Sequence, residues 1–126
     1  MLVYSDDRNV RESVKLALGK RVHPDLPVLE YVETATEDIT IQTFDAGGLT
    51  LAILDGEAVP AGGMGIARQV KDEIYNCPPV LVITGRAQDA WLATWSRAEA
   101  AVQHPIDPMH LAVTVAGLLR DRLAVR

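Results

Sequence analysis

The apolar residues of the chain fall into short continuous runs that alternate with amphipathic segments. β-Prone runs cover Leu2–Ser5, Val28–Val32, Leu49–Leu54, Pro79–Ile83 and Ala100–Val102. Between and after these runs, apolar positions recur with the spacing of one helical face, over Asn9–Leu18, Glu37–Ala46, Met64–Tyr75, Ala87–Arg97 and Asp107–Leu123. The pattern predicts a strand followed by a helix, repeated along the whole chain.

The strand-like runs are too apolar for a sheet that exposes one face to water. Runs of this kind are typical of parallel strands covered on both faces. Strands that alternate with helices imply right-handed crossovers and one parallel sheet between two layers of helices. We therefore expect residues 1–126 to form a single α/β domain, a doubly wound five-stranded sheet with its ligand site at the carboxyl ends of the strands.

Composition and charge narrow the classes of function. The chain has a formal net charge of −5 and no dense cluster of Lys and Arg, which argues against direct contact with nucleic acid. No apolar run approaches the ~20 residues of a membrane span, and the N-terminus lacks the basic start of a signal peptide. The single cysteine, Cys77, excludes an internal disulfide and fits a reducing compartment. We expect a cytoplasmic protein that is not inserted in a membrane.

Polar residues stand where the predicted strands end. Asp6 and Asp7 follow the first strand, Asp55 the third, Thr84 the fourth and His104 the fifth. A parallel sheet brings these ends to one edge, where three carboxylates repel one another unless a cation lies between them. Mg²⁺ is the natural counter-charge because it prefers oxygen ligands. With the metal bound, Asp55 could attack a phosphoryl group while Thr84 holds the phosphoryl oxygens.

Each of these residues also has a structural interpretation. Asp55 followed by Gly56 is a common turn pair, and Asp6 or Asp7 could cap the first helix. Thr84 could belong only to a strand-to-helix turn. His104 is better explained as a hydrogen-bonded structural histidine than as a metal ligand, because no second His or Cys stands at ligand spacing.

Four segments in order carry a resemblance over nearly the whole chain: LVYSDDRNVRES, LAILDGEAVPAGGMG, PPVLVITG and QHPIDP. In them the sequence resembles the receiver domain of bacterial two-component response regulators. The resemblance implies the flavodoxin-like strand order 2-1-3-4-5, a cis bond before Pro105, and Asp55 as the residue phosphorylated by a histidine kinase. It further implies that Asp6, Asp7, Asp55 and the backbone carbonyl of Glu57 hold Mg²⁺, and that Thr84 and the residue at position 104 contact the phosphoryl group.

The sequence departs from the family's pattern in three places. His104 stands where the family has a lysine, and it lacks the lysine's length and permanent charge. Ala101 stands where the family has the aromatic residue that rotates on activation. The loop DGEAVPAGGMG is about two residues longer than usual. The departures favour an atypical receiver whose switch is degenerate.

The leading hypothesis is a stand-alone atypical receiver that works by protein–protein contact, as an adaptor or accessory subunit of a larger assembly, and that is not an enzyme. The runner-up is a functional phosphotransfer receiver phosphorylated on Asp55. A third hypothesis, a small metal-dependent hydrolase, lacks a positioned general acid or base. Trp91 and Trp95, one helical turn apart, are expected to pack in the core or to anchor the partner.

Overall fold

A computed structural model of the protein describes residues 1–59, 61–85 and 90–124. Five parallel strands form one sheet in the order β2-β1-β3-β4-β5, which confirms the predicted fold class and strand order. The elements follow along the chain as β1 (Leu2–Tyr4), α1 (Arg8–Leu18), β2 (Val32–Thr34), α2 (Glu37–Ala46), β3 (Ala52–Asp55), α3 (Gly63–Glu73), β4 (Val80–Thr84), α4 (Ala90–Trp95), β5 (Ala100–Gln103) and α5 (Pro108–Ala124).

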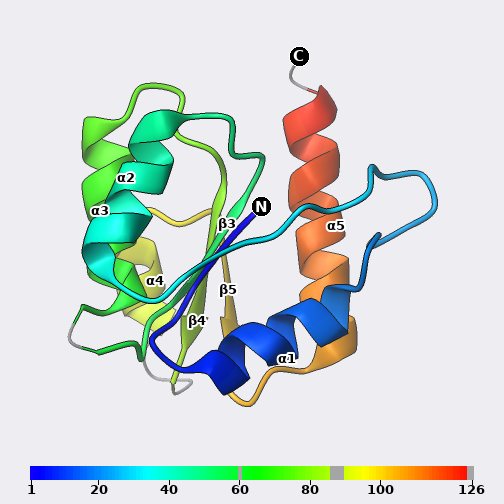
Figure 1. Ribbon diagram of the computed structural model, residues 1–126, viewed down its shortest axis with the longest axis horizontal. Helices are drawn as coiled ribbons and strands as arrows, with labels where there is room; N and C mark the ends of the chain where they lie inside the picture. The colour runs from blue at the N-terminus through cyan, green and yellow to red at the C-terminus, as the bar shows by residue number, and fades with distance from the viewer. Residues whose placement is uncertain (60, 86–89, 125–126) are drawn as a thin grey trace.

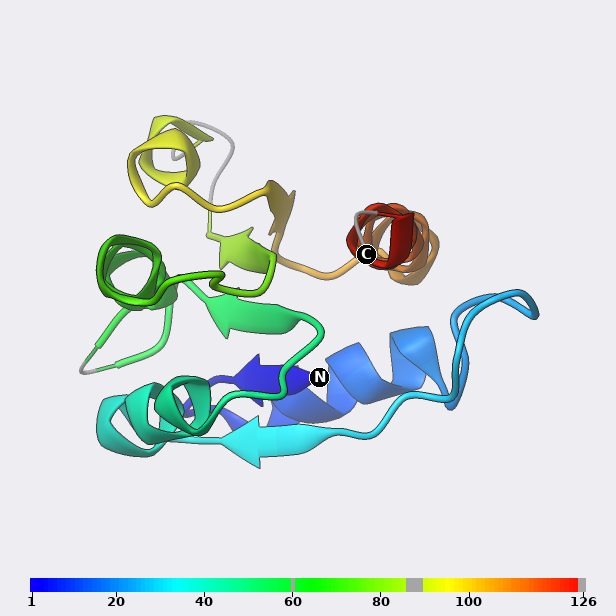
Figure 2. The same cartoon turned by 90° about the horizontal axis from the view of Figure 1, so that it is seen from above.

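The helices form one layer on each face of the sheet (Figures 1 and 2). Helices α1 and α5 lie side by side on one face, and α2, α3 and α4 cover the other. Side chains of successive strand residues point to opposite faces, so Ile53 and Leu54 of β3 enter different clusters. Ile53 packs in the cluster that contains Val14 of α1 and Leu111 of α5, whereas Leu54 packs in the cluster that contains Ile66 of α3.

The central strands are buried along their whole length. Every residue of β1, β3 and β4 is buried, as expected from their apolar sequences. The remaining buried apolar side chains of the two clusters come from the helices, from Val102 of β5 and from loop positions such as Leu26 and Ala58. Because the rigid sheet lies between both clusters, the carboxyl ends of its strands form a fixed platform for side chains at that edge.

Two predicted strands are displaced in the structure. The run Val28–Val32 was expected to be a strand, but β2 begins at Val32, and Val28 is exposed. β2 lies at an edge and pairs only with β1, where Leu2 faces Val32 and Tyr4 faces Thr34. Its position is therefore set by register with β1 and not by its local apolar content. Strand β3 begins at Ala52 instead of Leu49.

The other elements start and end within a few residues of the predicted bounds. Residues 87–89, the predicted start of the fourth helix, lie outside the described residues. Among the residues that the structure describes, no helix combines the length and the apolar character needed to cross a membrane.

Candidate functional site

The carboxyl ends of four strands border one open hollow. Its lining includes the acidic side chains predicted to converge and the histidine that follows β5: Asp6, Asp7, Val10, Asp55, Glu57, Gly85 and His104. These residues come from segments far apart in the sequence that the parallel sheet brings to the same edge. A small ligand entering the hollow would meet mainly carboxylates and one imidazole.

Asp55 is the last residue of β3, and its side chain is held by three hydrogen-bond donors. Its Oδ1 lies 2.9 Å from the backbone nitrogen of Glu57 and 2.9 Å from Nε2 of His104. Its Oδ2 accepts from the hydroxyl of Ser5 at 2.8 Å. A carboxylate that is only 3% exposed would be costly to bury without partners. The three donors therefore explain how an apolar strand can end on a negative charge.

The two acids after β1 have different partners. Asp7 is the N-cap of α1, and its Oδ1 accepts from the backbone nitrogen of Asn9 at 2.8 Å, so Asp7 takes the capping role left open by the sequence. The Oδ1 of Asp6 accepts from the backbone nitrogen of Val59 at 3.1 Å. Asp6 thereby ties β1 to the long loop that follows Asp55.

The oxygen atoms around the hollow are of the type that binds a magnesium ion. Mg²⁺ prefers oxygen ligands and is commonly held by one or two carboxylates together with water; Asp6, Asp7, Asp55 and the carbonyl of Glu57 would supply such ligands. Over residues 1–59, 61–85 and 90–124, no three His, Cys, Asp or Glu side chains are already gathered around a common point at metal-binding distance. Among these described residues, the acidic side chains therefore do not form a preassembled metal site.

Thr84 and His104 differ in how they face Asp55. His104 follows β5, and its peptide bond to Pro105 is cis, as predicted. Its ring contacts the Asp55 carboxylate directly. The hydroxyl of Thr84 is buried and donates to the backbone carbonyl of Val102 at 3.3 Å. In this structure Thr84 thus bonds to strand β5, and His104 is the one of the pair that reaches Asp55.

Two glycines allow the backbone to close tightly around Asp55. A Cβ atom on Gly63, the first residue of α3, would lie 2.7 Å from the carbonyl oxygen of Asp55. A Cβ atom on Gly56 would lie 2.7 Å from the carbonyl oxygen of Ile83, to which the Gly56 nitrogen donates. Real Cβ atoms do not approach backbone this closely, so both positions require glycine for the observed packing.

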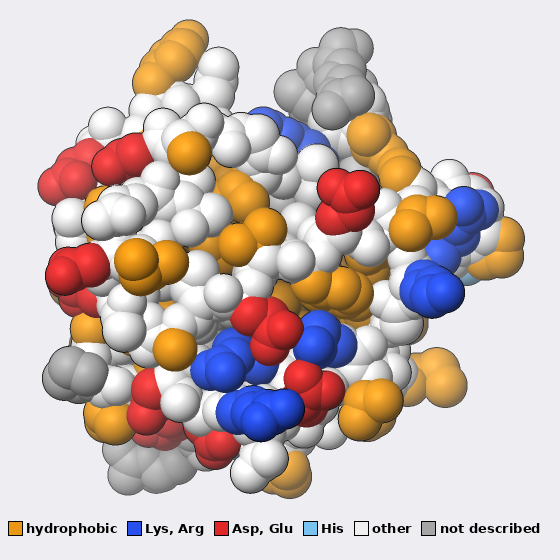
Figure 3. All heavy atoms as spheres, in the orientation of Figure 1, with side chains coloured by type: hydrophobic (Ala, Val, Ile, Leu, Met, Phe, Trp, Pro, Cys, Tyr) orange, Lys and Arg blue, Asp and Glu red, His pale blue; other side chains and the backbone are white. Residues whose placement is uncertain are grey.

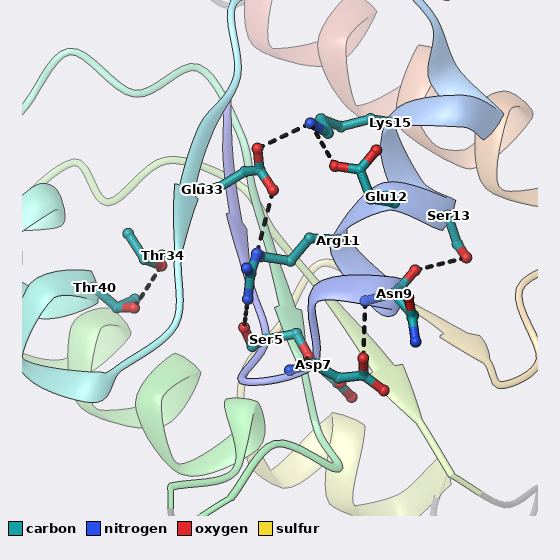
Figure 4. Close-up of polar contacts among 11 residues, drawn as sticks. Ser5, Asp7, Asn9, Arg11, Glu12, Ser13, Lys15, Glu33, Thr34 and Thr40 are labelled. Atoms are coloured by element: carbon teal, nitrogen blue, oxygen red, sulfur yellow. Dashed lines mark hydrogen bonds and ion pairs between the residues drawn. The ribbon is translucent and has the colours of Figure 1, made fainter.

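Ser5 and Arg11 also take part in the site, although neither residue belongs to the predicted set of site residues. The Arg11 guanidinium donates to the carbonyl oxygen of Ser5 at 2.6 Å and to Oε1 of Glu33 at 3.2 Å, as Figure 4 shows. Lys15 contacts the other oxygen of Glu33 at 2.9 Å. The hydrogen bond from Lys15, assisted by Arg11, holds the pKa of Glu33 below its ordinary value. The sequence feature that could have pointed to Ser5 is its hydroxyl at the end of the predicted apolar strand Leu2–Ser5.

The cluster around Glu33 lies at the surface. Figure 3 shows basic and acidic side chains next to one another over α1, where Arg11, Lys15, Glu12 and Glu33 form ion pairs. Through Arg11 this exposed cluster is joined to Ser5, which is fully buried. Two hydrogen bonds, one between Glu33 and Arg11 and one between Arg11 and Ser5, therefore join the surface cluster to the interior of the site.

The two tryptophans lie on the surface of α4. The side chain of Trp91 is 65% exposed and that of Trp95 is 47% exposed. The guanidinium of Arg68 lies over the Trp95 ring, 5.2 Å from its centroid, and donates to the Trp95 carbonyl at 2.8 Å. Neither indole belongs to the two core clusters, so both are accessible to a partner.

The chain is 64% identical, over 120 residues, to two uncharacterized response regulatory proteins of Mycobacterium tuberculosis, MT3230 and Rv3143. The alignment covers 95% of this chain and 90% of each relative. No protein-family model matches the chain.

Solved structures share the fold. A receiver domain protein (CheY-like) from Methanospirillum hungatei superposes with a TM-score of 0.80 at 18% identity, over 99% of this chain and 96% of that one. The BeF3-activated DrrB receiver domain superposes with a TM-score of 0.76 at 19% identity, over 94% of this chain and 95% of that one.

Proposed function

The chain belongs to the receiver domains of bacterial response regulators, and from that premise we propose that Asp55 accepts a phosphoryl group from a histidine kinase. The observation that carries this proposal is the contact of His104 with a buried Asp55 carboxylate at the edge of an open hollow. Although His104 is shorter than a lysine, it reaches the same acceptor. The contact favours phosphotransfer over a purely passive role.

The transfer is a displacement at phosphorus. One carboxylate oxygen of Asp55 attacks the phosphorus of the donor, a P–O bond forms, and the bond from phosphorus to the donor breaks. The leaving group departs with the bonding electron pair, as acetate when the donor is acetyl phosphate and as imidazole when it is a kinase phosphohistidine. Mg²⁺, held by Asp6, Asp7, Asp55 and the Glu57 carbonyl, would supply charge neutralisation for the phosphoryl oxygens.

The residues of this chain orient the attacking group. An ionised carboxylate only accepts hydrogen bonds, so the His104 nitrogen in contact with it, Nε2, carries the proton and donates. The Glu57 nitrogen donates to the same oxygen, and Ser5 donates to the other. A carboxylate fixed in this way loses little further freedom when the donor arrives, which lowers the barrier to attack.

Labelling with acetyl phosphate tests the proposal. The intact chain should gain the mass of one phosphoryl group, and peptide mapping should place the group on Asp55. Asp55→Asn should remove the label, whereas Asp45→Asn, which changes an exposed aspartate on α2, should keep it. A label that survives Asp55→Asn would contradict the assignment of the acceptor.

A second role is supported by a separate observation. The exposed indoles of Trp91 and Trp95 lie on α4. The Thr84 hydroxyl is bonded to the Val102 carbonyl of β5, and the family's aromatic switch position is occupied by Ala101. We propose that the face formed by the two tryptophans binds a partner protein whether or not Asp55 is phosphorylated. In this role the domain is an adaptor or accessory subunit of a larger assembly.

A further inference from the structure

We propose that Ser5 is a positioning residue for the Asp55 carboxylate: its hydroxyl holds Oδ2, so that Oδ1 is directed toward His104 and the hollow. The inference deepens the proposed function, on which its kinetic part rests. It assigns a role to a residue that lies outside the acidic residues, the hydroxyl and the histidine predicted to form the site.

The Ser5 hydroxyl makes two hydrogen bonds, and both are to residues of the site. Ser5 is fully buried, and its Oγ donates to Oδ2 of Asp55 at 2.8 Å. The same oxygen accepts from the backbone nitrogen of Asp7 at 3.0 Å. A hydroxyl has one proton to donate. Because the Asp7 nitrogen occupies a lone pair of Oγ, the proton is left to point at the carboxylate.

The backbone that carries this hydroxyl is held on both sides. The Ser5 nitrogen donates to the carbonyl of Thr34 in β2 at 3.2 Å, and the Ser5 carbonyl accepts from Arg11 of α1 at 2.6 Å. Arg11 is anchored in turn by Glu33 of β2, as Figure 4 shows. The position of the hydroxyl is thus set by three elements, β1, α1 and β2, and not by the rotamer of Ser5 alone.

A held Oδ2 restricts how the carboxylate can turn. Rotation about the Cβ–Cγ bond of Asp55 would break the bond to Ser5 and leave Oδ2 without its donor in a buried place. With the bond intact, Oδ1 keeps its contacts with the Glu57 nitrogen and His104. Because small misplacements of a reacting group cost large factors in rate, the loss of this one hydroxyl should be visible in the rate of phosphorylation.

The test compares Ser5→Ala, Ser5→Thr and a control in the full chain, with acetyl phosphate as the donor. Ser5→Ala should slow the labelling of Asp55 by about tenfold or more, and Ser5→Thr, which restores a hydroxyl, should recover most of the rate. The control is Thr40→Val, which deletes another buried hydroxyl, one that bonds to the Thr34 hydroxyl at 2.8 Å and donates to the Thr36 carbonyl at 2.7 Å. It should label at the parental rate.

A second readout does not depend on labelling. In amide and imidazole NMR spectra, Ser5→Ala should shift the Glu57 amide and the His104 ring signals, because both groups donate to the carboxylate that Ser5 orients. Thr40→Val should leave these signals in place. If Ser5→Ala does not fold, Ser5→Cys replaces it with a weaker donor of similar size, and the same slowing and the same shifts are expected.

The outcomes separate the two proposals. A parental labelling rate in Ser5→Ala, or equal slowing in Ser5→Ala and Thr40→Val, would overturn the positioning role. If the parent chain takes no label on Asp55, the phosphoacceptor proposal fails, and the spectra then decide on Ser5 alone. In that case unmoved Glu57 and His104 signals overturn the role, and shifts in Ser5→Ala that Thr40→Val lacks support it.

Discussion

His104 and Asp55, 49 positions apart in the sequence, meet at the carboxyl edge of the sheet with Nε2 2.9 Å from Oδ1. The imidazole is partly exposed on the side of the hollow, whereas the carboxylate is almost fully buried. The imidazole therefore lies between the solvent and the Asp55 carboxylate, and each of the two residues can be substituted separately.

The first prediction removes that ring. His104→Ala should slow labelling of Asp55 by acetyl phosphate about tenfold or more, because the loss of a hydrogen bond to a charged group costs about 1.5–3 kcal/mol. His104→Lys should keep the contact and most of the rate. His110→Ala, which removes an exposed histidine on α5, is the matched control. Equal rates in His104→Ala and the parent chain would show that the imidazole is not needed.

The second prediction concerns magnesium. If Asp6, Asp7 and Asp55 share a site, Mg²⁺ should raise the melting temperature by mass action. At a free Mg²⁺ concentration of ten times the Kd, the free energy of unfolding should rise by about 1.4 kcal/mol. Asp55→Asn should abolish most of that gain, and Asp45→Asn on α2 should retain it. Thermal melts over a Mg²⁺ titration measure this response. If the response of Asp55→Asn equals that of the parent chain, the three acids do not share a metal.

The third prediction follows from the lowered pKa of Glu33, whose ordinary value is 4.5. A carboxyl with a lowered native pKa stabilises the fold above its unfolded pKa and loses that contribution as the pH falls through the native pKa. Glu33→Gln should therefore be less stable than the parent at neutral pH, by at most about 1 kcal/mol because water screens the pair. The difference should shrink on acidification below pH 4.5.

Denaturant unfolding at several pH values measures this difference. The control is Glu73→Gln on α3, a carboxylate that accepts from the side-chain amide of Gln69. We expect it to show no comparable loss of stability at neutral pH. A gap between Glu33→Gln and the parent that stays constant down to acidic pH would mean that the effect is not due to the charge of Glu33.

The fourth prediction tests the tryptophan face. Alanine at Trp91 or Trp95 should weaken a partner complex by about 2 kcal/mol or more if that indole is an anchor, whereas Asp55→Asn should leave the complex intact. The amount of captured partner is compared by co-purifying each variant from the native cell extract. Mass spectrometry identifies the captured protein. Loss of the complex in Asp55→Asn but in neither tryptophan variant would favour a phosphorylation-gated partner over the adaptor role.

The arrangement of the sheet was predictable because burial on both faces leaves a clear trace in the sequence. The runs around Ile53 and Leu81 are apolar throughout, and both become central strands. The edge strand was misplaced because its residues are chosen by pairing with β1, which local apolarity does not report. Topology alone likewise brings Asp6, Asp7 and Asp55 to one edge.

The contacts within the site were not predictable in the same way. That Ser5 donates to Asp55, or that Thr84 bonds to Val102, depends on side-chain rotamers and on distances between segments far apart in the chain. For Asp7 the sequence left a cap and a metal ligand both open, and only the geometry at Asn9 identifies the cap. Residue types thus locate the site, and packing determines which atoms meet.

The close approach at Gly56 and Gly63 has a consequence for how such sites are sought in other genomes. Both glycines leave room for backbone that passes within 2.7 Å of where a side chain would begin. A homologue that keeps the aspartate but carries a larger residue would have to move the backbone of Ile83 if the change is at position 56, or the peptide group of Asp55 itself if it is at position 63. A pattern search that scores only the acidic residues would count such a homologue as having an intact site. A useful signature must therefore also require glycine at the positions of Gly56 and Gly63.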